Sequence, residues 1–335
     1  MSSVTTLPEV DLRDRPGQLR DRLREVAHEV GFFYLIGHEV PEVLTGRVLA
    51  AARRLFALPQ ADKDAVAMVR SPHFRGYTRL GGELTGGEVD WREQIDIGPE
   101  RDPIGGPGKP DYLWLQGPNQ WPSGVPELAG IVAEWDAALS AVARTLLRHW
   151  AAALGSAPDV FDAAFAGAPA TLIKIVRYPA TAAGSQGVGA HRDSGVLTLL
   201  LAERGSQGLQ VRAGRDGGWV DAPGRDGAFI VNIGELLELA TGGYLRATEH
   251  RVNLRHRADR ISVPYFFNPR LDAQIPTLSL PAELAERGGL RADPSDPIFS
   301  VYGRNAWKSR LRAHPDVAAA HGYVTGTAED VTPGE

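Results

Sequence analysis

Between Thr171 and Asn268 the sequence consists of short, β-branched segments separated by glycine, proline or charged residues. In order they are TLIKIVRYP (171–179), GVLTLLLAE (195–203), GLQVRAG (208–214), GGWVDAP (217–223), GAFIVNIG (227–234), ATEHRVNLR (247–255) and RISVPYFFN (260–268). Seven segments at this spacing, interrupted only by the helical pattern ELLELAT (235–241), predict an antiparallel sandwich or barrel. We therefore expect a mainly β fold with flanking helices and a β core over residues 171–270.

The residues before this core predict helices and loops. Leu19, Leu23, Val26 and Val30 recur every three or four residues, which indicates an amphipathic helix over 16–30. The other predicted elements are a buried strand in 31–40, a helix in 41–59, loops with brief strands in 71–125 and a long helix in 124–155.

The expected organisation has four parts. They are a helical and loop region (1–125), a long helix packing on the core (126–170), the β core (171–270) and a C-terminal extension (271–335). This extension contains a helical pattern in 305–322 and ends in TGTAEDVTPGE (325–335), an acidic tail that is expected to be disordered.

Composition excludes several classes of function. The chain has 335 residues, of which 43% are hydrophobic and 23% charged, and a formal net charge of -5, which favours neither nucleic acid nor an anionic membrane as partner. It contains no cysteine, so disulfides, thiolate catalysis, iron–sulfur clusters and cysteine zinc sites are excluded. No signal peptide or membrane-spanning run is apparent. The expectation is a cytoplasmic protein that acts on a small molecule without an obligate protein partner.

A metal site is predicted by His191-Arg192-Asp193 together with His250. On a strand, residues two apart point to one face, so His191 and Asp193 can reach one ion. His250, from a separate predicted strand, supplies a third ligand. Two imidazoles and one carboxylate on one side of an ion are the arrangement of non-haem iron(II) oxygenases.

The spacing of His191 and Asp193 alone is weak evidence, because nine histidines predict about one such match by chance. His314-Pro315-Asp316 is such a match, in a helical, proline-interrupted stretch. Arg260 and Ser262 strengthen the prediction, because they alternate with apolar residues ten positions after His250. A guanidinium and a hydroxyl on one strand face suit a carboxylate ligand.

These residues resemble those of the iron(II)/2-oxoglutarate-dependent dioxygenase superfamily, in its isopenicillin N synthase-like branch. Further matching stretches are GFFYLIGH (31–38), LFALPQADK (55–63), FRGYTRLGGE (74–83), GVGAHRDSGVLTLLL (187–201) and VNIGELLELATGG (231–243). The resemblance implies a double-stranded β-helix (jelly-roll) core and Fe(II), 2-oxoglutarate and O2 as requirements.

The resemblance also implies roles for individual residues. The metal ligands would be His191, Asp193 and His250, with no catalytic residue beyond this site. Arg260, Ser262 and Tyr178 would bind the C5 carboxylate of 2-oxoglutarate. Plant relatives usually carry Asn two residues before that tyrosine, where this chain has Val176.

The implied reaction hydroxylates, desaturates or cyclises a metabolite, with release of succinate and CO2. Tyr77, Arg79, Glu83 and Thr85 lie in a Gly-rich stretch whose mixed charges suit an amino acid or a peptide-like metabolite; supporting the β core is the alternative role. Phe267 is expected to line the other wall, although phenylalanine is more often a core residue.

Lys174 shares a predicted strand face with Tyr178 and would balance an anionic cofactor or substrate. A lysine that extends to solvent at the end of the strand is the alternative.

Three other functions remain open from the sequence. A 2-oxoglutarate-independent oxidase of the isopenicillin N synthase type would also carry the Arg260/Ser262 pair. A non-catalytic jelly-roll module would keep the scaffold without the chemistry. A cupin-like isomerase or a zinc hydrolase would use similar ligands but would not need Arg260.

Overall fold

The computed structural model describes residues 6–180, 185–214, 217–254, 259–290, 294 and 296–323. The strands are β1 (Glu9–Asp11), β2 (Phe32–Ile36), β3 (Gly76–Thr78), β4 (Glu83–Thr85), β5 (Glu88–Asp90), β6 (Glu93–Ile97), β7 (Leu172–Tyr178), β8 (Gln186–His191), β9 (Leu197–Ala202), β10 (Leu209–Arg212), β11 (Trp219–Asp221), β12 (Phe229–Ile233), β13 (His250–Asn253) and β14 (Arg260–Phe267). The helices are α1 (Pro16–Glu29), α2 (Glu42–Ala57), α3 (Gln60–Ala65), α4 (Leu128–Ala153), α5 (Glu235–Ala240), α6 (Ala282–Ala285), α7 (Tyr302–Ala313) and α8 (Pro315–Ala320), with short 3-10 turns η1 (Met68–Arg70), η2 (Asp111–Leu115) and η3 (Asp162–Phe165).

Two sheets form a β sandwich, which confirms the predicted jelly-roll class. The larger sheet has the strand order β1-β2-β12-β9-β14-β7-β6-β3, and the smaller has the order β11-β10-β13-β8. All pairs in these two sheets are antiparallel except β1 with β2. Each of the seven strands predicted after Thr171 is present, and β8 is an additional strand between β7 and β9.

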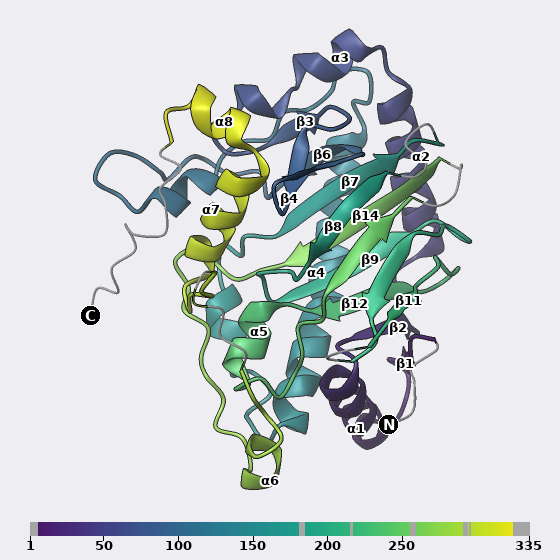
Figure 1. The fold of residues 1–335 in the computed structure, drawn as a ribbon, viewed down its shortest axis with the longest axis vertical. Helices are drawn as coiled ribbons and strands as arrows, with labels where there is room; N and C mark the ends of the chain where they lie inside the picture. The colour runs from purple at the N-terminus through teal and green to yellow at the C-terminus, as the bar shows by residue number, and fades with distance from the viewer. Residues whose placement is uncertain are drawn as a thin grey trace.

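The larger sheet has a different apolar layer on each face. One face packs on the smaller sheet through side chains such as Phe32, Val176, Val188 and Val252. The other face packs on the helices, and Figure 1 shows α4 running behind the strands. This face is the larger core, and Trp135 of α4 is fully buried in it. Strands of the larger sheet are therefore covered on both sides, which explains their nearly continuous apolar sequences.

The N-terminal region is part of this sheet rather than a separate layer. Strands β1, β2, β3 and β6 extend the larger sheet, and the small hairpin β4–β5 lies against β8. In the C-terminal region, the helical pattern breaks at Pro315 into α7 and α8, because proline lacks the N–H that a continuous helix needs. The predicted tail at 325–335 lies outside the described residues. Within the described part of the chain, no helix is both long enough and apolar enough to span a membrane.

Candidate functional site

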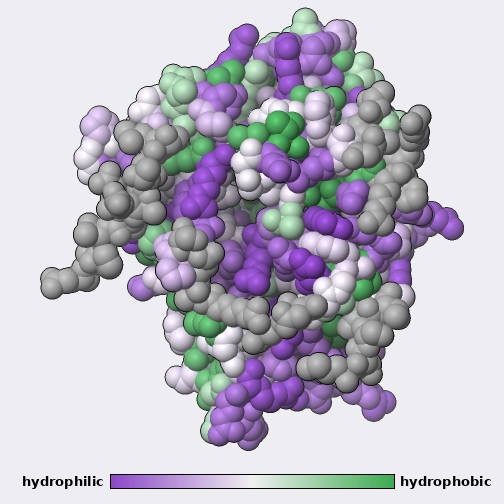
Figure 2. Space-filling model, viewed as in Figure 1, coloured by the Kyte–Doolittle hydropathy of each residue, from purple (hydrophilic) through white to green (hydrophobic). Residues whose placement is uncertain are grey.

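A pocket of about 370 Å³ opens between the two sheets and helix α7. Apolar side chains such as Val188, Leu200 and Val252 form part of its lining. Eight Arg or Lys side chains and four Asp or Glu side chains also line it, so its surplus of positive charge favours anionic ligands. In Figure 2 the hollow near the middle of this face is bordered mostly by hydrophilic side chains.

The three predicted metal ligands meet at one wall of the pocket. His191 ends β8 and His250 begins β13, and the two are cross-strand partners, so their rings lie 4.3 Å apart. Asp193 lies two residues beyond the end of β8 rather than within the strand. One of its oxygens, Oδ1, is 3.6 Å from Nε2 of His191 and 3.8 Å from Nε2 of His250. The three ligand atoms lie within 4.8 Å of one another, which is close enough to hold one metal ion.

Hydrogen bonds orient both imidazoles toward this point. Nδ1 of His191 lies 2.8 Å from the carbonyl of Gly189, and Nδ1 of His250 lies 3.1 Å from the carbonyl of Thr248. Because a carbonyl only accepts, each Nδ1 carries the proton and donates it. Each Nε2 therefore keeps its lone pair and faces Asp193, as a metal ligand requires.

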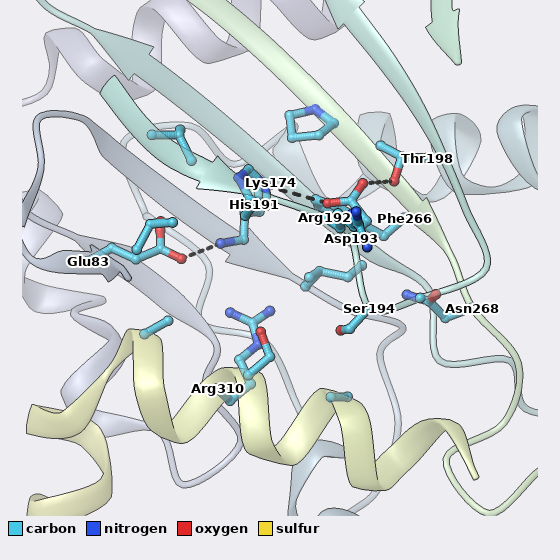
Figure 3. A pocket seen from close by; sticks show the side chains of 18 of the residues that line it. Glu83, Lys174, His191, Arg192, Asp193, Ser194, Thr198, Phe266, Asn268 and Arg310 are labelled. Atoms are coloured by element: carbon cyan, nitrogen blue, oxygen red, sulfur yellow. Dashed lines mark hydrogen bonds and ion pairs between the residues drawn. The ribbon is translucent and has the colours of Figure 1, made fainter. Parts of the chain in front are cut away.

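The carboxylate of Asp193 is held in the same way. Its second oxygen, Oδ2, accepts a hydrogen bond from the hydroxyl of Thr198 at 2.5 Å (Figure 3). It also accepts one from the side-chain amide of Asn232 at 2.8 Å. Two donors occupy Oδ2, so Oδ1 is left to face the histidines. The geometry favours a monodentate carboxylate ligand.

The electrostatics of Asp193 and His250 favour the protonation states that metal binding needs. Burial would lower the pKa of His191, but its contact with Asp193 raises it, so a metal ion has to displace a proton from this ring. Burial alone would raise the pKa of Asp193, but the neighbouring His191 and His250, together with the hydrogen bond from Thr198, hold it well below its usual range. Burial lowers the pKa of His250 to about 4, and the neighbouring His191 adds to this effect. At neutral pH the site thus presents an ionised carboxylate and a neutral His250.

A second polar group lies on the facing strands of the larger sheet. Arg260 and Ser262 point into the pocket from β14, and the guanidinium of Arg260 lies 4.6 Å from the ring centre of Tyr178 on β7. Arg260 is buried, and its Nη1 donates to the carbonyl of Gln207 at 2.5 Å. Among the described residues, its Nε has no hydrogen-bond partner and no carboxylate pairs with it. A buried cation without an anion is costly, so this group fits an anionic ligand such as a carboxylate.

The predicted substrate residues divide into two groups. Glu83 and Thr85 line the pocket. Tyr77 and Arg79 were wrongly placed there: the buried Tyr77 hydroxyl donates to Glu93 at 2.5 Å, and the exposed Arg79 pairs with Asp64. Both of these side chains therefore make contacts within the N-terminal region instead of lining the pocket.

The structure also places Phe267 outside the pocket, although it was expected to line a wall of it. Its ring is fully buried and stacks on Phe165 at 4.5 Å, within the larger core, whereas its neighbour Phe266 lines the pocket. Lys174 does line the pocket, but its ammonium is buried and donates to Glu83 at 2.6 Å. A carboxylate oxygen of Asp96 lies 3.6 Å from the same ammonium. It is therefore neither free to bind a cofactor nor extended into solvent.

The sequence prediction missed the contribution of helix α7. Tyr302, Ala306, Arg310 and Ala313 line the pocket from one face of this helix. Their spacing of three or four residues is a signal visible in the sequence. His314, the chance match to the metal motif, is buried with Nε2 3.6 Å from Glu83. It joins no group of metal-binding side chains among the residues that the structure describes.

The chain is similar to known proteins along most of its length. Residues 170–269 match the model of the 2OG-Fe(II) oxygenase superfamily, and residues 7–124 match the non-haem dioxygenase N-terminal model, described for morphine synthesis. The fungal 2-oxoglutarate-dependent dioxygenase frbJ of Dothideomycetidae sp. is 34% identical, over 94% of this chain and 91% of that protein. A homoarginine-6-hydroxylase of Glycine max is 34% identical, over 80% of this chain and 83% of that protein.

Solved structures share the fold. A 2OG-Fe(II) oxygenase family protein of Caulobacter crescentus superposes with a TM-score of 0.72 at 25% identity, over 93% of this chain and 99% of that one. A full-length Neurospora crassa protein, solved in complex with alpha-KG, has a TM-score of 0.72 at 21% identity, over 91% of this chain and 98% of that one.

Proposed function

Since the chain belongs to the 2OG-Fe(II) oxygenase superfamily and is a 2-oxoglutarate-dependent oxygenase, we propose that His191, Asp193 and His250 hold its iron. The support is the common point that their ligand atoms face, with both Nδ1 atoms already used by backbone carbonyls. Two nitrogens and one oxygen on one side of the ion leave positions for the co-substrate and O2.

We further propose that Arg260 and Ser262, with Tyr178, anchor the distal carboxylate of 2-oxoglutarate. The observation that carries this assignment is the buried Arg260 guanidinium, which has an unpartnered Nε and no pairing carboxylate among the described residues. A guanidinium binds a carboxylate through two parallel hydrogen bonds, and the Ser262 hydroxyl on the same strand face adds a third donor. Lys174 is left out, because Glu83 already binds its ammonium.

When bound, iron and 2-oxoglutarate use O2 to oxidise a substrate C–H bond, with succinate and CO2 as co-products. The chain's part is to orient the ligands, exclude water and position the substrate carbon. The apolar lining residues Val188, Leu200 and Val252 help to exclude water from the pocket.

The proposed substrate is a small polar metabolite of the amino acid or peptide type, which is hydroxylated, desaturated or cyclised. Its support is the set of acidic and basic side chains that line the pocket. Glu235 lines the pocket, and within the described residues its side chain has no hydrogen bond or ion pair. Burial raises the pKa of this carboxyl group to about 7, and a bound amino or guanidino group would favour its ionised form. The similarity to homoarginine-6-hydroxylases supports an amino acid and favours hydroxylation.

A direct test is a screen for substrate-stimulated succinate. Purified enzyme with Fe(II), 2-oxoglutarate and O2 is offered arginine, homoarginine, lysine and small peptides, and succinate and product mass are measured. The expected result is one succinate per product for at least one member, with no product from the Asp193→Ala variant. If the whole panel gives only the substrate-free rate, the amino acid class is wrong. Product without succinate would instead indicate the oxidase chemistry of isopenicillin N synthase.

We also infer that the enzyme works in the cytoplasm without nucleic acid, a membrane or an obligate protein partner. The support is its negative net charge and the reducing conditions that keep iron in the Fe(II) state. Activity that requires a purified second protein would contradict this inference.

A further inference from the structure

A second group of cations lines the pocket on the side of helix α7, away from Arg260. It consists of Arg310 on α7 and Arg75, just before β3, with the phenol of Tyr302 beside them. Figure 3 shows the Arg310 side chain rising from α7 toward Lys174. The charges of Arg75 and Arg310 both act on the Tyr302 phenol, and so does the charge of Asp193. Arg310 on α7 and Asp193, just beyond β8, line the same pocket from different elements, so this corner and the metal site share it.

The corner belongs to a buried cluster that has more cations than anions. Its cations are Arg75, Arg92, Lys174 and Arg310, and its carboxylates are Glu83, Asp90 and Asp96. Buried His314 next to Glu83 adds no charge at neutral pH, because burial lowers its pKa to about 4. Four cations against three carboxylates leave one positive charge, which is costly away from water unless a bound anion balances it.

The two arginines of the corner carry this surplus. Arg75 donates only to backbone carbonyls, those of His73 at 3.2 Å and Leu115 at 2.8 Å, and its Nε has no partner. No carboxylate pairs with it among the described residues. Burial lowers its pKa to about 10, yet it stays charged at neutral pH. Arg310 uses only Nη1, which donates to Asp96 at 2.5 Å, so within the described part of the chain its other donors are free.

We propose that Arg310, Arg75 and Tyr302 form a receptor for a carboxylate of the substrate, opposite the iron. This assignment rests on the proposed function and narrows the substrate class to metabolites with a carboxylate at the end that is not oxidised. The remaining Arg310 donors and the Tyr302 hydroxyl provide the charge-assisted hydrogen bonds. Since the receptor lies on α7, this helix selects the substrate.

The test measures binding of acids and of their uncharged amides. Anaerobic enzyme is loaded with Fe(II) and saturated with 2-oxoglutarate, so that the Arg260 end is filled. Two pairs of probes, pentanoate with pentanamide and homoarginine with its amide, are then titrated by calorimetry. In the wild type each acid is expected to bind about 10- to 100-fold more tightly than its amide, as for a charge-assisted pair.

The Arg310→Gln variant is expected to lose this preference for the acid, whereas its affinity for 2-oxoglutarate stays unchanged. Arg304→Gln is the matched control, because Arg304 lies on the same helix, stacks on Phe299 and does not line the pocket. If Arg310→Gln fails to fold because Asp96 loses its partner, Tyr302→Phe tests the same corner with that ion pair intact. Its expected effect is about threefold to tenfold weaker acid binding with unchanged amide binding.

Several outcomes overturn the proposal. The first two are equal binding of acid and amide, and no binding of any acid at tens of millimolar. The others are an undiminished acid preference in Arg310→Gln (or in Tyr302→Phe, where Arg310→Gln does not fold) and a loss of 2-oxoglutarate affinity in Arg310→Gln. The proposed function fails separately. If pentanoate binds in an Arg310-dependent manner but no amino acid is oxidised, the receptor stands and the amino acid class is wrong.

Discussion

The carboxylate of Asp90, in the N-terminal hairpin, accepts a hydrogen bond at 3.2 Å from the backbone N–H of Gly189 in β8. The carbonyl of the same Gly189 accepts the hydrogen bond of His191 Nδ1. Asp90 is fully buried and also accepts hydrogen bonds from Gln186 at 3.0 Å and Thr85 at 2.7 Å. A residue far from the metal motif in sequence thus fixes the strand that presents a proposed iron ligand.

We therefore expect Asp90→Ala to weaken iron binding by up to about tenfold. This is the lower end of the cost of losing a ligand's partner, because Asp90 acts on His191 through Gly189. It also removes one carboxylate partner of buried Arg92, which destabilises the fold by about 3 kcal/mol. Iron affinity is measured by competition with a chelator, and stability by urea unfolding. Asp90→Asn keeps an acceptor oxygen and is expected to recover most of the iron affinity. Loss of stability with unchanged iron affinity would contradict a positioning role.

The ligand assignment predicts that substitutions of His191, Asp193 and Thr198 impair iron binding to different degrees. His191→Ala and Asp193→Ala are expected to abolish succinate formation while the protein stays folded, because the pocket is open to solvent. Thr198→Val removes one of the two donors to Oδ2 and leaves Asn232, so iron affinity is expected to fall by only about tenfold. Bound iron and the circular dichroism spectrum are measured for each variant. Turnover by either alanine variant would refute that ligand.

The 2-oxoglutarate assignment predicts different effects for two substitutions of Arg260. Arg260→Ala removes the guanidinium and is expected to raise the KM for 2-oxoglutarate by about 100-fold or more. Arg260→Lys keeps the charge but not the two-pronged geometry and is expected to recover only part of this loss. The measurement is succinate formation against 2-oxoglutarate concentration. A lysine variant as good as the wild type would show that charge alone suffices.

The alternation of side chains along β14 separates the residues that line the pocket from Phe267, which does not line it. Arg260, Ser262 and Phe266 have the same parity on β14 and all line the pocket, as the period of two requires. The same rule assigns Phe267 to the opposite face, where the structure places it. Phe266 was thus predictable from the parity that identified Arg260.

Non-local packing explains what the sequence did not reveal. The seven strands follow from local patterns, and β8 and β13 bring His191 and His250 together by their pairing. The docking of α7 over the pocket depends on contacts between segments far apart, such as Arg310 with Asp96, which no local period encodes. The role of Asp90 is hidden for the same reason.

The corrected positions of the two phenylalanines predict separable effects. Phe267→Ala empties a fully buried site and is expected to cost about 3–5 kcal/mol of unfolding free energy. Phe266→Ala is expected to cost much less stability but to change the KM for substrate. Urea unfolding and steady-state kinetics on both variants test this difference. Equal destabilisation by the two would contradict the placement.

His314 predicts a pH dependence of stability. Burial lowers its pKa from 6.5 to about 4, although Glu83 and Asp96 oppose this shift, and Arg310 and Lys174 support it. The unfolded chain therefore binds a proton below pH 6.5 that the folded protein does not bind until about pH 4. The free energy of unfolding that depends on neutral, buried His314 is complete above pH 6.5. It is lost progressively between pH 6.5 and 4, by up to about 3 kcal/mol.

The measurement is urea unfolding above pH 6.5 and midway between pH 6.5 and 4, for the wild type and His314→Gln. Other buried groups, His250 among them, titrate in the same window, so the quantity of interest is the difference between the two proteins. The variant lacks a titrating imidazole, and its stability is expected to fall less on acidification, by about 1–2 kcal/mol at the lower pH. Identical losses in both proteins would show that His314 is already protonated in the fold or stays exposed to solvent.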